Sequence, residues 1–216
     1  MIMNDFFYEY LDELIPNPRC ELNYTKDYEL LLAVMLSAQT TDVRVNSVTE
    51  ILFRKYPTLE DLAYADVDDI IHIIRPIGTY FKKAKNVIEI SKKILEVGGV
   101  VPNDREYLEQ LPGVGRKTAN VVLSNIYDVP CIAVDTHVER VSKRLGFARE
   151  KDDVLTVEKK LTKLIPQEKL NKMHHQILLF GRYYCKARNP LCDTCKLKEQ
   201  CKYYKKNNKK VSEKSL

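Results

Sequence analysis

The sequence predicts an all-α fold. Glycine is scarce, with seven residues among 216, and the nine prolines fall mostly between stretches whose apolar residues recur at helical spacing. This pattern predicts many short helices and few strands. Hydrophobic residues make up 44% of the chain and charged residues 30%, which is typical of a globular protein with one or two compact domains.

The N-terminal third contains four of the expected helices. The first runs from Phe6 to Ile15 and ends at a Pro-Asn-Pro stretch. Tyr28–Ala38 is apolar on most faces and therefore predicts a central, buried helix. Thr41 is the expected N-cap of a helix that ends near Tyr56, and Thr58 with Asp61 has the pattern of a capping box for the next helix.

The remaining helices follow from the same periodicity. Gly146 is a suitable residue to end one of them, because glycine readily adopts a positive φ. We expect helices at Val67–Ile74, Tyr80–Val97, Arg105–Gln110, Arg116–Ile126, Thr136–Leu145, Val154–Leu164 and Gln167–Tyr183.

Charge and hydropathy limit the compartment and the partners. No apolar run approaches the roughly 20 residues that span a bilayer, and residues 1–5 lack the features of a signal peptide, so we expect no membrane association and an intracellular protein. The net charge of +5 is mild, but the tail at 202–216 holds six lysines and one acidic residue. Such a tail is more often a solvated, disordered end than a phosphate-attracting patch.

The segment Leu111-Pro112-Gly113-Val114-Gly115-Arg116-Lys117 is the first that indicates chemistry. Gly113 and Gly115 predict a tight turn that leads into a helix N-terminus, which is a favourable site for phosphate, although a plain helix–helix turn has similar residues. Lys117 falls in the first turn of that helix. The helix dipole and Arg116 favour its neutral, nucleophilic amine, and partial burial would act in the same direction, although most lysines at such positions are solvated.

A carboxylate precedes a second helix start. In Ala133-Val134-Asp135-Thr136-His137, Asp135 is either an N-terminal cap or a carboxylate that assists proton transfer and stabilises positive charge on a sugar ring. We expect Thr136 and Glu139 to form a capping box there.

Four cysteines predict a metal site. Cys185, Cys192, Cys195 and Cys201 have the spacing C-x6-C-x2-C-x5-C, which is dense for a reducing compartment. Zinc is the competing occupant, but zinc modules more usually have two C-x2-C pairs, so a [4Fe–4S] cluster fits better. Cys20 and Cys131 lie outside this spacing and are expected to be buried thiols.

Together these segments resemble the endonuclease III family of DNA glycosylases, in the helix–hairpin–helix superfamily. The resemblance rests on residues 111–120, on Val134-Asp135-Thr136-His137, on the cysteine spacing, and on Leu36-Ser37-Ala38-Gln39-Thr40-Thr41-Asp42. These segments follow the order of the family, and the similarity runs from about Tyr28 to Cys201.

The resemblance implies a two-domain helical fold with a DNA cleft between the domains. Residues 22–130 would form a six-helix domain with the helix–hairpin–helix at about 107–127. Residues 1–21 and 131–216 would form an iron–sulfur cluster domain, with the cluster loop at 185–201 and the basic tail at 202–216. The expected activity is that of a bifunctional DNA glycosylase and AP lyase in base excision repair. It would remove oxidised pyrimidines from duplex DNA and cleave the abasic site by β-elimination. The expected enzyme is a monomer in the cytoplasm, associated with the nucleoid.

The resemblance also implies roles for single residues. Lys117 would attack C1′ and form a Schiff base, and Asp135 would activate the lysine or stabilise the cationic sugar. Gln39 and His137 would contact DNA near the flipped nucleotide, and Gly113 and Gly115 would contact its backbone. Lys186 and Arg188 would bind phosphate from the loop between the first two cysteines.

One position departs from the family pattern, and two alternatives compete with this function. In Ile77-Gly78-Thr79-Tyr80 the family commonly has an apolar wedge where this chain has Thr79, which fills a gap in the base stack less well. A mismatch-adenine glycosylase generally lacks the lysine and has a further C-terminal domain, whereas this chain has Lys117 and ends 15 residues after Cys201. A non-catalytic DNA-binding module would not need both Lys117 and Asp135.

Overall fold

The computed structural model describes residues 5–212, with side chains as far as residue 207. Within residues 5–212 the regular structure is helical throughout, without a strand, which confirms the all-α prediction. The expectation for residues 1–4, that they carry no signal peptide, and the end of the tail at 213–216 lie outside the described residues. The chain divides into two compact units, Cys20–Asp128 and Met1–Arg19 with Val129–Leu216, here named the hairpin unit and the cysteine unit.

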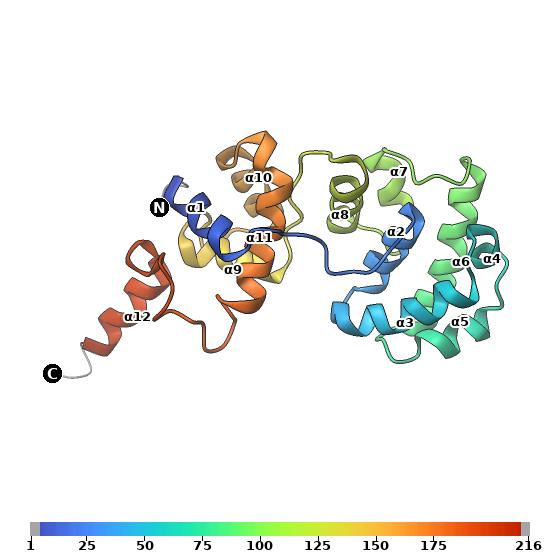
Figure 1. The fold of residues 1–216 in the computed structure, drawn as a ribbon, viewed down its shortest axis with the longest axis horizontal. Coiled ribbons are helices and arrows are strands. Elements are labelled where there is room, and N and C mark those ends of the chain that lie inside the picture. Colours follow the sequence, from blue (N-terminus) through green and yellow to red (C-terminus); the bar gives the residue numbers. More distant parts are fainter. Residues whose placement is uncertain (1–4, 213–216) are drawn as a thin grey trace. The chain divides into compact units, whose positions relative to one another are not determined.

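The hairpin unit is built around one buried helix. Tyr28 to Leu36 are all buried in α2, which packs against α3, α6 and α8, so its apolar surface forms the centre of this unit (Figure 1). Thr58 and Asp61 form the predicted capping box of α4. The helices of the unit are α2 (Asp27–Leu36), α3 (Asp42–Lys55), α4 (Leu59–Ala63), α5 (Val67–Ile74), α6 (Tyr80–Glu96), α7 (Arg105–Gln110) and α8 (Arg116–Tyr127).

The cysteine unit joins the start of the chain to its C-terminal half. In α1, Phe7 packs edge-on against Phe147 at a ring-centroid distance of 5.2 Å. Gln176 of α11 donates to Asp12 (2.7 Å) and to the carbonyl of Ile15 (3.1 Å), so α1 and α11 are also joined by polar contacts. The helices of the unit are α1 (Asp5–Leu14), α9 (Thr136–Leu145), α10 (Val154–Leu164), η1 (Gln167–Lys169), α11 (Leu170–Tyr183), η2 (Lys198–Gln200) and α12 (Lys202–Ser212).

The tail differs from its prediction. Residues 202–212 form α12, so the expectation of a disordered end is wrong for this part of the tail. The helix forms because its first turn packs on α9: the guanidinium of Arg144 stacks on the ring of Tyr203 at 4.1 Å. This contact between residues far apart in the sequence is invisible to a reading of charge and composition.

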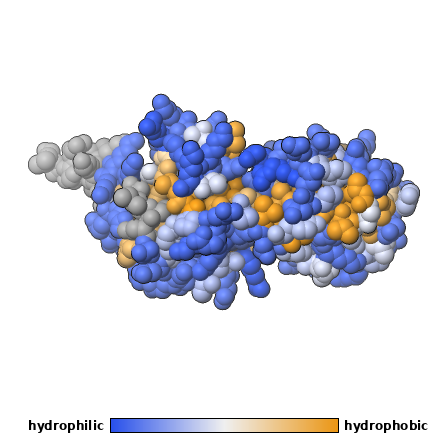
Figure 2. Space-filling model, turned by 90° about the horizontal axis from the view of Figure 1, so that it is seen from above, coloured by the Kyte–Doolittle hydropathy of each residue, from blue (hydrophilic) through white to orange (hydrophobic). Residues whose placement is uncertain are grey.

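Hydrophilic residues cover most of the surface visible in Figure 2. Among the described residues, no helix is both long and apolar enough to cross a membrane.

Candidate functional site

The predicted hairpin is present in the hairpin unit. Helix α7 ends at Gln110, the amide of Val114 donates to the carbonyl of Leu111 (3.1 Å), and α8 begins at Arg116. Gly113 has φ +78°, and Gly115 is the N-cap of α8, which has neither a side-chain cap nor an acidic residue in its first turn. The N-terminus of α8 therefore keeps its positive dipole end open to an anion such as phosphate.

The two glycines of the turn provide a matched pair of variants. A Cβ at Gly113 would lie 2.6 Å from Nδ2 of the buried Asn86 and would require a left-handed backbone, whereas a Cβ at Gly115 would meet nothing within 4 Å. We expect Gly113→Ala to cost about 1–3 kcal/mol of unfolding free energy and Gly115→Ala less than about 1 kcal/mol. If phosphate approaches this backbone, Gly115→Ala will weaken DNA binding although the fold is retained. Thermal unfolding and a DNA-binding titration separate the two effects, and unchanged binding by Gly115→Ala would remove this turn from the DNA contacts.

Lys117 lies in the first turn of α8, and its side chain is exposed. Its position therefore agrees with the sequence reading, but the partial burial considered there is absent from this structure. It lies next to Arg116 at the positively polarised end of a helix.

Two further predicted DNA contacts have an unusual backbone conformation. Gln39 (φ 58°) and Thr79 (φ 56°) are exposed and left-handed, which is uncommon for residues other than glycine and is frequent at binding sites. The hydroxyl of Thr79 donates to the carbonyl of Gly78 at 2.7 Å, so it is turned back onto its own loop. Whether Thr79 enters the base stack stays a prediction.

A buried lysine, which the sequence reading missed, joins these two loops. Nζ of Lys83 donates to the carbonyls of Leu36 (2.9 Å) and Ala38 (2.7 Å). The side chain is 4% exposed, and this burial lowers the pKa of Lys83. One cation in α6 thus holds the loop that carries Gln39. The signal was available, since Lys83 interrupts the apolar stripe of α6 at helical spacing.

Asp135 is the N-cap of α9 in the cysteine unit. Its Oδ1 accepts hydrogen bonds from the amides of His137 (2.9 Å) and Val138 (2.8 Å). The predicted capping box of Thr136 and Glu139 is therefore wrong, because the carboxylate one residue earlier already binds these amides. Within the described part of the chain, the other oxygen of Asp135 has no hydrogen bond. The carboxylate is thus held rigidly through one oxygen, and the second remains available for chemistry.

Arg140, one turn further along α9, connects this helix start to the cysteines. Its guanidinium lies 3.2 Å from Nδ1 of His137 and donates to the carbonyls of Gly181 (2.6 Å) and Cys185 (3.1 Å). Burial is the largest cause that lowers the pKa of Arg140. His137 is thereby fixed at the N-terminus of α9, in the same unit as Asp135.

The four predicted ligands line one small cavity. Cys185, Cys192, Cys195 and Cys201 surround it together with aromatic side chains, Tyr184 among them. Burial raises the pKa of the Cys192, Cys195 and Cys201 thiols, and repulsion from the neighbouring cysteines raises each further. Four thiolates that are partly buried around one cavity repel one another, so a cationic group between them is needed to keep them charged. Among the described residues, no set of three or more His, Cys, Asp or Glu side chains is placed to hold a metal ion. The four sulfur donors around this cavity are a ligand set of the kind that binds iron–sulfur clusters or zinc.

The loop between the first two cysteines carries Lys186 and Arg188, and both are exposed. Arg144 of α9 holds this loop in place by donating hydrogen bonds to the carbonyls of Lys186 (2.7 Å) and Ala187 (3.0 Å). It also lies 3.5 Å from Sγ of Cys185. The sequence reading missed Arg140 and Arg144, because nothing local indicates which carbonyls, some forty residues away, they bind.

The other two cysteines differ from each other. Cys131 is buried as expected, whereas Cys20 is only half-buried, so the expectation for Cys20 is wrong. It lies at the start of the hairpin unit, in a segment outside the helices, where less of the core covers it.

Comparisons with known proteins identify the family of the chain. Residues 32–167 match the model of the HhH-GPD superfamily base excision DNA repair proteins. The chain is 49% identical to endonuclease III of Bacillus subtilis over 95% of this chain and 94% of that protein. It is 46% identical to endonuclease III of Escherichia coli strain K12 over 91% and 93%.

Solved structures give the same result. The chain resembles a trapped endonuclease III–DNA covalent intermediate with a TM-score of 0.89 and 48% identity, covering 96% of this chain and 99% of that one. It resembles a non-covalent endonuclease III–DNA complex with a TM-score of 0.90 and 48% identity, covering 94% and 96%. The chain therefore belongs to the endonuclease III family of HhH-GPD base excision DNA repair proteins.

Proposed function

We propose that this chain removes oxidised pyrimidines from duplex DNA and cleaves the resulting abasic site, with Lys117 as its nucleophile. The chain is a bifunctional DNA glycosylase and AP lyase of base excision repair. The observation that carries the role of Lys117 is its position: an exposed amine in the first turn of α8, directly after a hairpin whose open helix end suits a DNA phosphate.

The chemistry proceeds through a covalent intermediate. Nζ of Lys117 attacks C1′ as the bond from C1′ to the base breaks, and the base leaves with a proton. Ring opening gives a Schiff base between Lys117 and C1′. Loss of a proton from C2′ then breaks the bond between C3′ and its phosphate oxygen, and hydrolysis of the imine frees the lysine. A mismatch-adenine glycosylase needs no such amine, and a purely architectural DNA-binding module needs no nucleophile.

The function is tested by the products. Duplexes that carry thymine glycol or an abasic site are incubated with the protein, and the labelled strand is resolved on a denaturing gel. We expect base release followed by a strand end with an unsaturated aldehyde, the product of β-elimination. Base release without cleavage would favour a monofunctional glycosylase, and no reaction on either substrate would favour a DNA-binding module.

Asp135 is proposed as the carboxylate that takes a proton from Lys117 or stabilises the cationic sugar. Its cap and its chemistry can be separated, because asparagine is an equally good N-cap but has no charge. We expect Asp135→Asn to keep the melting temperature and to lower the excision rate about 10²–10⁴-fold. Asp135→Ala should lower the rate as well and also cost about 1 kcal/mol of stability through the lost cap. An Asp135→Asn enzyme with the original rate would leave Asp135 a cap alone.

The cysteine cavity is proposed to hold a [4Fe–4S] cluster. Cys185, Cys192, Cys195 and Cys201 would be its ligands, and the group would supply four covalent links between segments that are otherwise loops, together with the capacity for electron transfer. In this arrangement Lys186 and Arg188 project from a loop fixed at both ends, where they would bind DNA phosphate. An absorption band near 400 nm in the purified protein would support the cluster, and its absence with bound zinc would overturn it.

The remaining proposals concern the partner. Gln39, Thr79 and His137 would contact DNA near the flipped nucleotide, and Gly113 and Gly115 its backbone. The left-handed loops of Gln39 and Thr79, held together through Lys83, support the first of these roles. The enzyme would act as a monomer in the cytoplasm, bound to the nucleoid.

A further inference from the structure

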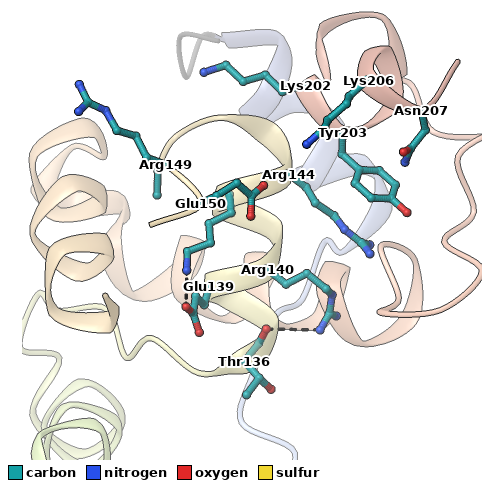
Figure 3. Close-up of a pocket in the computed structure, with 12 residues that line it drawn as sticks. Thr136, Glu139, Arg140, Arg144, Arg149, Glu150, Lys202, Tyr203, Lys206 and Asn207 are labelled. Carbon is teal, nitrogen blue, oxygen red and sulfur yellow. Dashed lines mark hydrogen bonds and ion pairs between the residues drawn. The ribbon is translucent and has the colours of Figure 1, made fainter. Parts of the chain in front are cut away.

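Besides the cavity of the four cysteines, the cysteine unit has a basic pocket that the proposed chemistry does not use. It is a pocket of about 680 Å³ between α9 and the first turns of α12 (Figure 3). Two carboxylates line it, Glu139 and Glu150. They are outnumbered by the cationic residues of the lining, which are Arg140, Lys143, Arg144, Arg149, Lys202 and Lys206.

Three of these cations already have partners inside the protein. Arg140 and Arg144 donate to backbone carbonyls around the first cysteine, and Lys143 pairs with Glu139 at 2.6 Å. This pair also neutralises one of the two carboxylates. The side-chain donors of these residues are thus engaged within the protein, although the carbonyls do not neutralise the charges of Arg140 and Arg144.

The other three cations are available. In the described part of the chain, the side chains of Arg149, Lys202 and Lys206 have no hydrogen bond or ion pair. Figure 3 shows them along the upper rim, and Lys202 and Lys206 both come from α12. Only Glu150 opposes them within the lining, so the pocket presents a local excess of positive charge.

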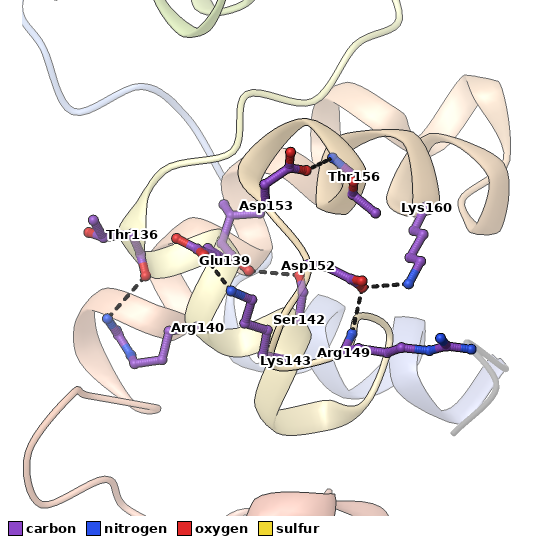
Figure 4. A network of polar contacts seen from close by, with 11 residues as sticks. Thr136, Glu139, Arg140, Ser142, Lys143, Arg149, Asp152, Asp153, Thr156 and Lys160 are labelled. Atoms are coloured by element: carbon purple, nitrogen blue, oxygen red, sulfur yellow. Dashed lines mark hydrogen bonds and ion pairs between the residues drawn. The ribbon is translucent and has the colours of Figure 1, made fainter.

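Two of these exposed cations are placed by neighbouring structure, Lys202 through its stem and Arg149 through its backbone. Gly146 ends α9 with φ +90°, and a Cβ there would lie 2.6 Å from Cδ of Lys202, so the lysine stem lies directly across this helix end. The amide of Arg149 donates to Asp152 (2.7 Å), whose carboxylate also pairs with Lys160 (Figure 4). Because Asp152 is occupied in this way, the guanidinium of Arg149 extends away from the polar network.

We infer that this pocket binds backbone phosphates of duplex DNA at a distance from the damaged nucleotide. The inference rests on the proposed function. Arginine and lysine around a concave surface bind phosphate without reading sequence, and such contacts position a protein on its strand. Helix α9 has ten residues and is therefore about 15 Å long, which corresponds to roughly four base pairs of duplex. Asp135 caps one end of α9, and Arg149 and Lys202 lie near the other, so the pocket would extend the contact beyond the reaction site.

The salt dependence of binding tests this inference. The triple variant Arg149→Gln, Lys202→Gln and Lys206→Gln is compared with a charge-matched control in which the exposed Lys92, Lys159 and Lys163 become glutamine. The ligand is a long duplex with a tetrahydrofuran abasic analogue, which forms no Schiff base. Each neutralised phosphate contributes about 0.9 to the slope of log K against log salt. We expect the pocket variant to lower the slope by about 2–3 and the control to leave it unchanged.

A shorter duplex and a small anion complete the test. When the duplex is trimmed by about five base pairs on either side in turn, the wild type should fall to the affinity of the pocket variant on one side only. An unchanged slope, or an equal loss in the control, would overturn the inference. Tripolyphosphate bound tightly in the pocket, with no dependence on duplex length, would also overturn it and indicate a site for a free anion. Borohydride trapping at saturating DNA needs only the reaction site, so its outcome reports separately on the proposed function.

Discussion

Lys117→Ala is expected to abolish strand cleavage while the protein still binds abasic DNA. In the proposed chemistry the atom that bonds to C1′ is Nζ of Lys117. Loss of this amine should therefore lower the rate of cleavage by at least about 10³-fold. Its exposed position in α8 means that truncation removes no core packing, and stability should be nearly unchanged. The measurements are single-turnover cleavage of an abasic duplex and a binding titration on the same duplex.

The neighbouring Arg116 provides the matched control. Arg116→Ala removes a cation from the same helix turn but leaves the nucleophile, so we expect weaker binding and a slower covalent step that is still present. Lys117→Arg keeps the positive charge without a free amine and should be as inactive as Lys117→Ala. Equal cleavage by Lys117→Ala and the wild type would remove this lysine from the mechanism.

Cys195→Ala is expected to be the most damaging change to the cysteine unit. Residues 185–201 contain only the short helix η2 and are otherwise held by turn hydrogen bonds and by Arg144, so loss of the proposed cluster should loosen this segment. The substitution should remove the absorption band near 400 nm and lower the free energy of unfolding by more than about 3 kcal/mol. Visible absorption, iron content and thermal unfolding measure these effects.

The control for this change is a cysteine outside the cavity. Cys20 is half-buried in the hairpin unit, and Cys20→Ala should keep both the absorption band and the iron content. If Cys195→Ala retained iron and stability like Cys20→Ala, the cavity would not hold the proposed cluster.

The sequence predicted the helices well where local signals define them. Four predicted helices have the same first and last residues in the structure, because capping and helix-breaking residues flank them: Val67–Ile74, Arg105–Gln110, Thr136–Leu145 and Val154–Leu164. The start of α9 shows the limit: two adjacent residues can both cap, and the sequence does not show which one binds the amides. The structure selects Asp135 over Thr136.

The features that the sequence missed depend on contacts between distant residues. Helix α12 forms against α9 through Arg144 and Tyr203, and the lysines of its sequence indicated only a solvated end. Lys83 reaches a loop more than forty residues away, and its burial follows from the packing of α6 on α2. The residues of the candidate site could thus be predicted from the sequence, whereas the side chains that hold them in place could not.

Borohydride trapping is the most direct test of the central claim, that Lys117 forms a Schiff base with the sugar. The protein is mixed with a duplex that carries an abasic site or thymine glycol, borohydride is added, and the covalent adduct is digested and mapped by mass spectrometry. The account predicts an adduct whose modified peptide contains reduced Lys117, and no adduct with Lys117→Ala. An adduct on another residue, or none from protein that carries the proposed cluster, would contradict it.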